Sequence, residues 1–403
     1  MNTLEQVRQR EQQYLLSTYA RLPLLAVEGK GVYLMDSEGR KYLDFLAGIA
    51  VNALGYAHPR IVRVLREQGK RLMHASNLYF NEHQGELAER LARITGMERA
   101  FFTNSGTEAV EAALKLARAH GKLLAPDGSK FEIVALENAF HGRTMGALSV
   151  TGQAKYRQAF EPLLPGVRFV SINDEAALAA SISERTCAVI LEGIQGEGGI
   201  VGCSPAFLRL ACQLTRQHQA LLIMDEIQCG LGRTGKWLAF QDQEITPDIV
   251  TLAKPIACGF PLGCMLARGA AANAFQPGQH GTTFGGGPLA CRLGLEFLNI
   301  MEEDELLNHI ASMGNLMLHG LQKLARKSKS ITEVRGRGLI LGLQLNRPAK
   351  PFVDRARDLG LLVNATHETV VRLLPPYIIQ PKHVRAALAI LRQSFAEVES
   401  GQA

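Results

Sequence analysis

Two charged side chains directly follow apolar segments that have the length of buried strands. Asp225 comes after the segment 221–224, and Lys254 lies just beyond the segment 249–252. A carboxylate in such a place is costly to desolvate without a cationic partner, which is either a neighbouring arginine or the proton on a bound heteroaromatic ring. A lysine at a strand end is often solvated, but burial lowers its pKa and allows it to form a Schiff base.

A third feature is typical of anion binding. The segment Ser105-Gly106-Thr107 separates an apolar strand from a helical stretch. The free N–H groups and the positive dipole end of the helix can hold a phosphate, and the Ser105 and Thr107 hydroxyls add donors. An ordinary helix N-cap is an equally good interpretation of this segment alone. Neither a Walker-type loop nor a Gly-x-Gly-x-x-Gly turn after a strand is present, which disfavours nucleotides.

The three features together predict pyridoxal 5′-phosphate (PLP) as the cofactor. Ser105, Gly106 and Thr107 would hold its phosphate, Asp225 would pair with its ring nitrogen and Lys254 would form the Schiff base. Each feature is weak by itself, whereas their order and their strand-end placement are specific. No metal site is expected, because the seven cysteines include no Cys-x-x-Cys pair.

These side chains need a sheet that brings strand ends together. From about residue 99 the sequence alternates short apolar strands with helical stretches, which predicts an α/β fold with a mostly parallel sheet flanked by helices. In such sheets, ligands bind beyond the carboxyl ends of the strands. The expected strands are 100–103, 133–136, 187–191, 221–224 and 249–252.

The chain ends predict a second, smaller unit. Residues 1–55 read as a polar arm followed by a hairpin, and residues 301–403 alternate helices and strands as a small α+β domain. We expect these two parts to share one core, with the cofactor-binding domain at residues 56–300 between them.

Composition excludes several other classes of protein. The chain has 403 residues and a net charge of +6 with dispersed basic residues, which does not indicate nucleic-acid binding. No apolar run approaches the roughly 18 residues that span a bilayer, so no membrane association is expected. The odd number of cysteines and the polar start of the chain favour reduced thiols and a cytoplasmic location.

The motifs also resemble those of a known family. The segments 104–109, 140–144, 195–199, 225–228, 281–286 and 371–376, together with Lys254, are similar to the class-III PLP-dependent aminotransferases over nearly the whole chain. The resemblance implies the PLP-dependent transferase type-I fold, with a large domain and a small α+β domain. It also implies a homodimer whose two active sites are shared between the subunits.

The resemblance assigns further residues to the cofactor. Phe140 would stack on the ring of PLP, and Gln228 would lie near its ring hydroxyl. Thr283 would reach the phosphate of the cofactor in the neighbouring subunit. Lys254, once released, would act as general base and acid.

The same resemblance assigns carboxylate-binding residues, for which bidentate guanidinium groups are well suited. Arg143 would bind the α-carboxylate of an acylated ornithine or the distal carboxylate of glutamate. Arg372 would bind the α-carboxylate of 2-oxoglutarate, with Glu197 pairing to it when an ω-amine is bound. Thr282 would contact the substrate in the partner subunit. Structural arginines and a solvated loop acid are the alternative interpretations of these side chains.

Segments 47–55 and 333–336 are most similar to the members that act on N-acetylornithine. The implied substrates are an amino acid and a 2-oxo acid: the terminal amine of N-acetylornithine passes to 2-oxoglutarate, giving N-acetylglutamate semialdehyde and glutamate in arginine biosynthesis. Succinylornithine and ornithine are alternative donors. An aminomutase, a decarboxylase and a non-catalytic PLP-fold protein are the alternatives from other classes.

Overall fold

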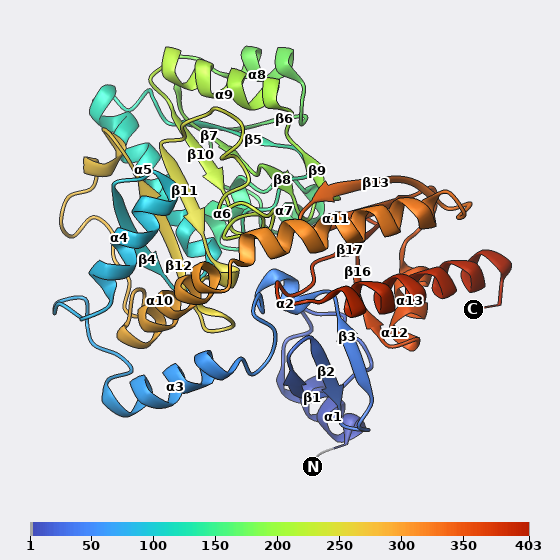
Figure 1. Cartoon of the computed structure of the whole chain (residues 1–403). Helices are drawn as coiled ribbons and strands as arrows, with labels where there is room; N and C mark the ends of the chain where they lie inside the picture. Colours follow the sequence, from blue (N-terminus) through green and yellow to red (C-terminus); the bar gives the residue numbers. More distant parts are fainter. Residues whose placement is uncertain (1–2, 403) are drawn as a thin grey trace.

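A computed structural model describes residues 3–402 and contains a seven-stranded central sheet (Figure 1). The strand order is β4-β12-β11-β10-β7-β5-β6, and only β12 is antiparallel to its neighbours. The expected α/β fold with a mostly parallel sheet is confirmed. The strands are β4 (Arg99–Thr103), β5 (Glu132–Leu136), β6 (Val167–Val170), β7 (Thr186–Leu191), β10 (Leu221–Asp225), β11 (Ile249–Leu252) and β12 (Gly263–Ala267).

Both faces of this sheet are covered. Alternate residues of β10 enter two different hydrophobic clusters: Leu221 and Ile223 pack on the side of α5 (Gly106–Leu124), and Leu222 and Met224 pack on the opposite side. Helix α5 contacts β4, β7, β10, β11 and β12, whereas α9 (Pro205–Gln217) contacts β7 and β10. A strand buried on both faces is apolar throughout, which is why these strands are recognisable in the sequence.

Two smaller sheets lie beside the central one. One has the order β1-β2-β3-β15 and the other β13-β14-β17-β16. Strand β15 pairs in parallel with β3, so a C-terminal strand completes the N-terminal hairpin. The domain limits at residues 55 and 300 stay a prediction. The strands are β1 (Ala26–Lys30), β2 (Tyr33–Asp36), β3 (Lys41–Asp44), β13 (Ile331–Arg337), β14 (Ile340–Leu345), β15 (Leu361–Leu362), β16 (Asn364–Thr366) and β17 (Val370–Leu373).

The remaining elements connect and cover these sheets. In Figure 1, α11 and α13 lie along the smaller sheets, and α10 runs towards the central sheet. The other helices and strands are α1 (Leu4–Tyr14), α2 (Ala47–Ala50), α3 (Pro59–Arg71), α4 (Gln84–Thr95), α6 (Met145–Ser149), α7 (Ala154–Arg157), α8 (Glu175–Ser181), β8 (Ile194–Gln195), β9 (Val201–Gly202), α10 (Pro288–Glu303), α11 (Leu306–Ala325), α12 (Lys350–Asp358) and α13 (Pro381–Ser400).

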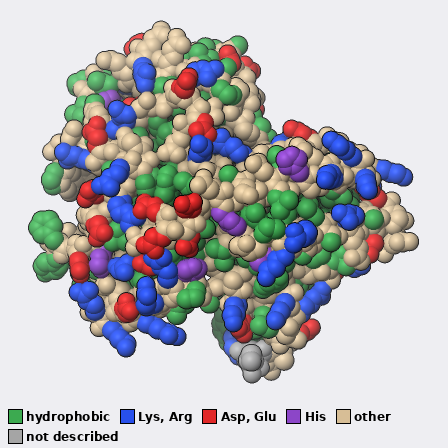
Figure 2. Space-filling model, viewed as in Figure 1, with side chains coloured by type: hydrophobic (Ala, Val, Ile, Leu, Met, Phe, Trp, Pro, Cys, Tyr) green, Lys and Arg blue, Asp and Glu red, His purple; other side chains and the backbone are tan. Residues whose placement is uncertain are grey.

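The surface mixes charges of both signs, as Figure 2 shows for one face. Within residues 3–402, no helix is long and apolar enough to cross a membrane. The same residues contain no group of three or more His, Cys, Asp or Glu side chains arranged to hold a metal ion.

Candidate active site

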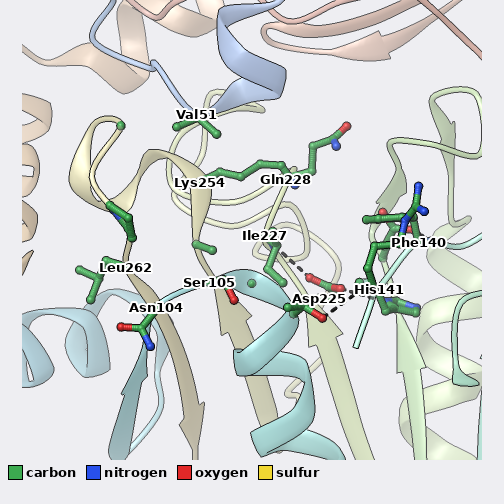
Figure 3. Close-up of a pocket in the computed structure, with 18 of the residues that line it drawn as sticks. Val51, Asn104, Ser105, Phe140, His141, Asp225, Ile227, Gln228, Lys254 and Leu262 are labelled. Carbon is green, nitrogen blue, oxygen red and sulfur yellow. Dashed lines mark hydrogen bonds and ion pairs between the residues drawn. The ribbon is translucent and has the colours of Figure 1, made fainter. Parts of the chain in front are cut away.

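A cavity of about 390 Å³ lies at the carboxyl ends of the central strands (Figure 3). It brings together the residues that the sequence placed after strands, together with Val51 from the N-terminal part of the chain. Of the predicted site residues, those that line it are Ser105, Gly106, Thr107, Phe140, Arg143, Asp225, Gln228 and Lys254.

Asp225 is the last residue of β10, and its carboxylate is only 3% exposed. Its Oδ2 lies 2.7 Å from Nδ1 of the buried His141, and the two side chains face each other in Figure 3. Its Oδ1 accepts hydrogen bonds from the Thr251 hydroxyl (3.0 Å) and from the Ile227 N–H (3.1 Å). The cationic partner of Asp225 within the chain is therefore a histidine, rather than the arginine that the sequence left open.

His141 carries a proton more readily than an ordinary histidine does. Burial disfavours its charged form, but the hydrogen bond to Asp225 and the negative charges of Asp225 and Glu192 outweigh burial and raise the pKa of His141. A protonated His141 forms an ion pair with Asp225 and orients this carboxylate at the cavity wall, where it can hold a proton on a basic ring nitrogen placed in the cavity.

Lys254 lies just beyond β11, at the start of a short 3₁₀ turn, and its backbone has a φ of +46°. This left-handed conformation is uncommon for a residue with a side chain, and such conformations concentrate at functional sites. Burial lowers the pKa of Lys254, while the charges of Asp225, Glu197 and Glu192 act in the opposite direction. A lowered pKa favours the free-amine form of a lysine, which is the form that Schiff-base chemistry requires.

The first turn of α5 is the segment in which the sequence predicts an anion cradle, and its contact with a phosphate stays a prediction. Gly106 is the first helical residue, and a Cβ on it would lie 2.8 Å from Cδ1 of Ile227. The Ser105 side chain accepts from the Glu108 N–H (3.3 Å), so the N-cap interpretation also describes the structure. The Thr107 hydroxyl lies 2.9 Å from the Thr144 hydroxyl. This contact connects the first turn of α5 to the loop between β5 and α6.

Phe140 and Arg143 line the opposite side of the cavity. The Phe140 N–H donates to Glu192 Oε2 (3.1 Å), and the Arg143 guanidinium lies 4.0 Å from the centre of the Tyr156 ring. Arg143 is exposed and 5.5 Å from the Phe140 ring centre, so its guanidinium is held at the cavity mouth by aromatic faces. This is a suitable place for a carboxylate of an incoming substrate.

Arg372 is fully buried and pairs with Glu197. Its Nη1 lies 2.5 Å from Glu197 Oε1 and donates to the Gly196 carbonyl and to Gln228 Oε1, both at 3.1 Å. Burial would raise the pKa of Glu197, but the charge and hydrogen bond of Arg372 lower it. Nη2 of Arg372 is buried without a hydrogen-bond partner among residues 3–402. The predicted pair is thus assembled beside the cavity, and Gln228 is held by Arg372.

Thr282 and Thr283 do not line the cavity of their own chain. Thr283 is exposed, and the Thr282 hydroxyl lies 3.4 Å from the Asn104 side-chain nitrogen. Asn77 donates to the Thr282 carbonyl (3.2 Å), which fixes this segment beside residues 72–80.

Three residues at the site lie outside the set that the sequence predicts. His141 and Thr251 hold Asp225, and Glu192 lies in the cavity wall, where burial raises its pKa to about 7. Glu192 directly follows β7, as Asp225 ends β10, so the rule that ligand-binding residues follow strands could have found it. Nothing in the sequence relates His141 to Asp225, since 84 positions separate them.

The cavity fits PLP on the chemistry of its donors. One cavity contains an amine with a lowered pKa, a carboxylate supported by a histidine, a helix N-terminus with free N–H groups and an aromatic face. These groups match the aldehyde, ring nitrogen, phosphate and ring of that cofactor.

Comparison with known proteins supports the same class. Residues 15–395 match the class-III aminotransferase family. The chain belongs to this family, and it is a transaminase whose cofactor is PLP.

Within the family, several relatives named acetylornithine aminotransferase are 42–46% identical to this chain. That of Aquifex aeolicus is 46% identical over 94% of this chain and 99% of its own. The structure of acetylornithine aminotransferase from Elizabethkingia anophelis has a TM-score of 0.86 at 31% identity, covering 98% of this chain and 100% of its own. The structure of ornithine aminotransferase from Toxoplasma gondii has a TM-score of 0.95 at 32% identity. The match covers 100% of this chain and 97% of the Toxoplasma chain. Another structure of the Toxoplasma enzyme is described with PLP at the active site.

Proposed function

We propose that this enzyme transfers the terminal amino group of N-acetylornithine to 2-oxoglutarate, giving N-acetylglutamate semialdehyde and glutamate in arginine biosynthesis. The single observation that carries the proposal is that Arg143 and Lys254 line one cavity while the Arg372–Glu197 pair lies beside it, against the lining residue Gln228. The names of relatives that are 42–46% identical over nearly the full length support the acetylated donor.

Lys254 and Asp225 perform the proton transfers in this proposal. PLP, when bound, supplies an electron sink for the carbon that carries the amine. Nζ of Lys254, with its lowered pKa, removes the proton from that carbon and later returns a proton as general acid. Asp225, held by His141 and Thr251, keeps the ring nitrogen protonated. Ser105, Gly106 and Thr107 would hold the phosphate of PLP, Phe140 would stack on its ring and Gln228 would lie near its ring hydroxyl.

The two arginines divide the two substrates between them. Arg143 takes the α-carboxylate of N-acetylornithine or the distal carboxylate of glutamate, and Arg372 takes the α-carboxylate of 2-oxoglutarate. Because Glu197 neutralises Arg372 while it is paired, a donor without a carboxylate beside its reacting amine leaves the pair closed. For 2-oxoglutarate, Glu197 moves away and the fully buried Arg372 becomes available.

Assembly as a homodimer in the cytoplasm belongs to the same proposal. Leu78, Tyr79 and Phe80 are 88%, 70% and 106% exposed, and Phe284 is 63% exposed next to Thr283. A hydrophobic surface of this kind is typical of a subunit interface. A partner covering it brings Thr282 and Thr283 to the other active site. The seven free cysteines agree with a reducing compartment.

The test compares N-acetylornithine, N-succinylornithine and ornithine as donors, with 2-oxoglutarate as acceptor and glutamate as the measured product. We expect the highest kcat/KM for N-acetylornithine. Ornithine is the second candidate, because the TM-score of 0.95 to an ornithine aminotransferase favours it. Glutamate formation that is fastest with ornithine would replace the proposal. Absence of glutamate with all three donors would favour an aminomutase or decarboxylase.

A further inference from the structure

A second cavity, which we call the rear pocket, has a volume of about 380 Å³. It lies between strand β13, the β8–β9 hairpin and the segment 239–243. Among the described residues, none of those lining it lines the active-site cavity. Its polar side chains are Gln243, Glu333, Arg335 and Arg337, and Cys203 and Leu208 are among its other lining residues.

Arg335 and Arg337 give the rear pocket its binding chemistry. They are two positions apart on β13 and therefore project from the same face of this edge strand. Arg337 Nη2 donates to the Ala239 carbonyl (2.8 Å), and its Nη1 lies 3.7 Å from Asp242 Oδ2. Its Nε is buried and has no acceptor in the part of the chain that the structure describes. The Arg337 guanidinium thus has one unsatisfied donor, which is buried in the wall, while the side chain as a whole is 38% exposed.

The local charge balance favours an anion. Asp242 is shared, because Lys236 Nζ also lies 3.5 Å from its Oδ1. Glu333 pairs with Arg335 Nη1 at 2.8 Å and is exposed. Among the described residues, Arg335, Arg337 and Lys236 form ion pairs with two carboxylates, Glu333 and Asp242. The carboxyl groups of Glu192 and Glu226 lie behind the pocket wall, where burial raises the pKa of both to about 7 and so disfavours their charged forms. Exposed ion pairs contribute little, so a planar carboxylate ligand can displace them at low cost.

The geometry points to the rear pocket as a binding site for a small dicarboxylate. One carboxylate of the ligand binds the Arg337 guanidinium, and the other binds Arg335 in place of Glu333. The two guanidinium groups, the volume of the rear pocket and the excess of cationic side chains over paired carboxylates all match this class of ligand. Such a site is separate from the proposed transamination and does not depend on it.

The rear pocket also contacts the turn that carries Glu197. Arg335 Nε donates to the Gly199 carbonyl at 2.9 Å, and the pocket walls include Gly193, Ile194, Ile200 and Val201 on both sides of that turn. A ligand that bridges β13 and the β8–β9 hairpin restrains residues 193–203. Occupancy of the rear pocket is thereby transmitted to the Glu197–Arg372 pair.

Malonate is the probe, and calorimetric titration of the holoenzyme is the measurement. Since malonate can also bind at Arg143 and at Arg372, R143Q is compared with the double variant R143Q/R337Q. Both variants keep Arg372, so the difference between them reports on Arg337 alone. We expect R143Q to keep a malonate site and R143Q/R337Q to bind it about tenfold more weakly, a loss of roughly 1.4 kcal/mol. R143Q/R337K keeps the charge without the planar fork and should also bind more weakly than R143Q.

Hydrogen–deuterium exchange provides a second measurement that does not require activity. Malonate should slow exchange in residues 193–203 of R143Q and leave it unchanged in R143Q/R337Q. Equal malonate affinity in these two variants, with both folded by circular dichroism, would overturn the proposal. Displacement of malonate by an equal concentration of sulfate would overturn the assignment to a dicarboxylate.

Discussion

Nδ1 of His141 and Oδ2 of Asp225 lie 2.7 Å apart in a place where neither side chain is more than 3% exposed. A buried, hydrogen-bonded ion pair of this kind has a fixed geometry, because either partner alone would be an unpaired charge. His141 approaches Asp225 from the loop after β5, and Thr251 approaches it from β11. Two segments besides β10 itself thus determine where the carboxylate points, which suits a group that must meet one ring nitrogen.

Replacing His141 therefore tests the positioning of Asp225. In H141A the carboxylate loses a charged hydrogen bond, which is typically worth about 1.5–3 kcal/mol. We expect PLP to bind the apoenzyme at least about tenfold more weakly, as measured by fluorescence titration. H141N, whose amide can still donate, should recover part of the affinity. H218A removes a histidine that pairs with Glu184 near the surface and is the control; equal PLP affinity in H141A and H218A would contradict the prediction.

The Glu197–Arg372 pair makes a prediction about donor selection. E197Q removes the charge that neutralises Arg372, so the α-carboxylate of glutamate can bind this arginine without displacing an ion pair. We expect kcat/KM for N-acetylornithine relative to glutamate to fall about tenfold, equivalent to roughly 1.4 kcal/mol. Half-reaction kinetics with each donor measure this ratio. E175Q, at an exposed position of α8, should leave it unchanged. An unchanged ratio in E197Q would remove Glu197 from donor selection.

Gly142 is required by the close approach of its loop to the phosphate cradle. Its φ is +140°, and an added Cβ would lie 2.2 Å from the Thr107 hydroxyl oxygen. G142A should displace Thr107 and weaken PLP binding to the apoenzyme, measured by the same titration. G69A is the matched control, because a Cβ there meets no atom within 4 Å. Position 69 lies inside α3, where alanine is favoured over glycine by about 1 kcal/mol, so G69A should keep PLP affinity and be slightly more stable.

The sequence predicts those residues of the site that lie at the carboxyl ends of buried strands. Asp225 and Lys254 are recognisable because continuous apolar segments precede them, and the residues of β10 and β11 are fully buried. Strand β6 was not predicted, since it lies at the sheet edge and contains the exposed Arg168. Strand β12 was also not predicted, because it directly follows the turn around Phe260.

Relationships between distant segments could not be predicted from one sequence. The partner of Asp225 is His141, which lies in a loop. The hydrophobic periodicity of a sequence identifies strands and helices, but it does not identify which loop passes a given strand end. The rear pocket likewise depends on β13 meeting the β8–β9 hairpin. Arg335 and Arg337 by themselves read as ordinary surface arginines. Tertiary contacts give these residues their environment, and only the structure contains those contacts.

The exposed hydrophobic residues near Thr283 predict a stable dimer. Phe80 is 106% exposed, and its replacement in F80D places a charge in the proposed interface. We expect the wild-type enzyme to be a dimer by light scattering and F80D to dissociate at much higher protein concentration. L123D is the control, because Leu123 is 66% exposed near the end of α5. A monomeric wild-type enzyme, or an F80D variant that dissociates like L123D, would contradict the proposed interface.

The pKa of Glu192 predicts how stability depends on pH. Burial raises this pKa from 4.5 to about 7. At a pH between these two values, the Glu192 carboxylate therefore takes up a proton when the protein folds. The contribution of Glu192 to the free energy of unfolding is therefore largest below pH 4.5 and is lost as the pH rises to about 7. The amide of E192Q does not titrate, so this pH-dependent contribution is absent from the variant. From pH 5 to pH 8, urea unfolding of the apoenzyme should show wild type losing stability relative to E192Q, by up to about 3 kcal/mol. E175Q should follow wild type, and parallel pH curves for wild type and E192Q would show that Glu192 is ionised in the folded protein throughout this range.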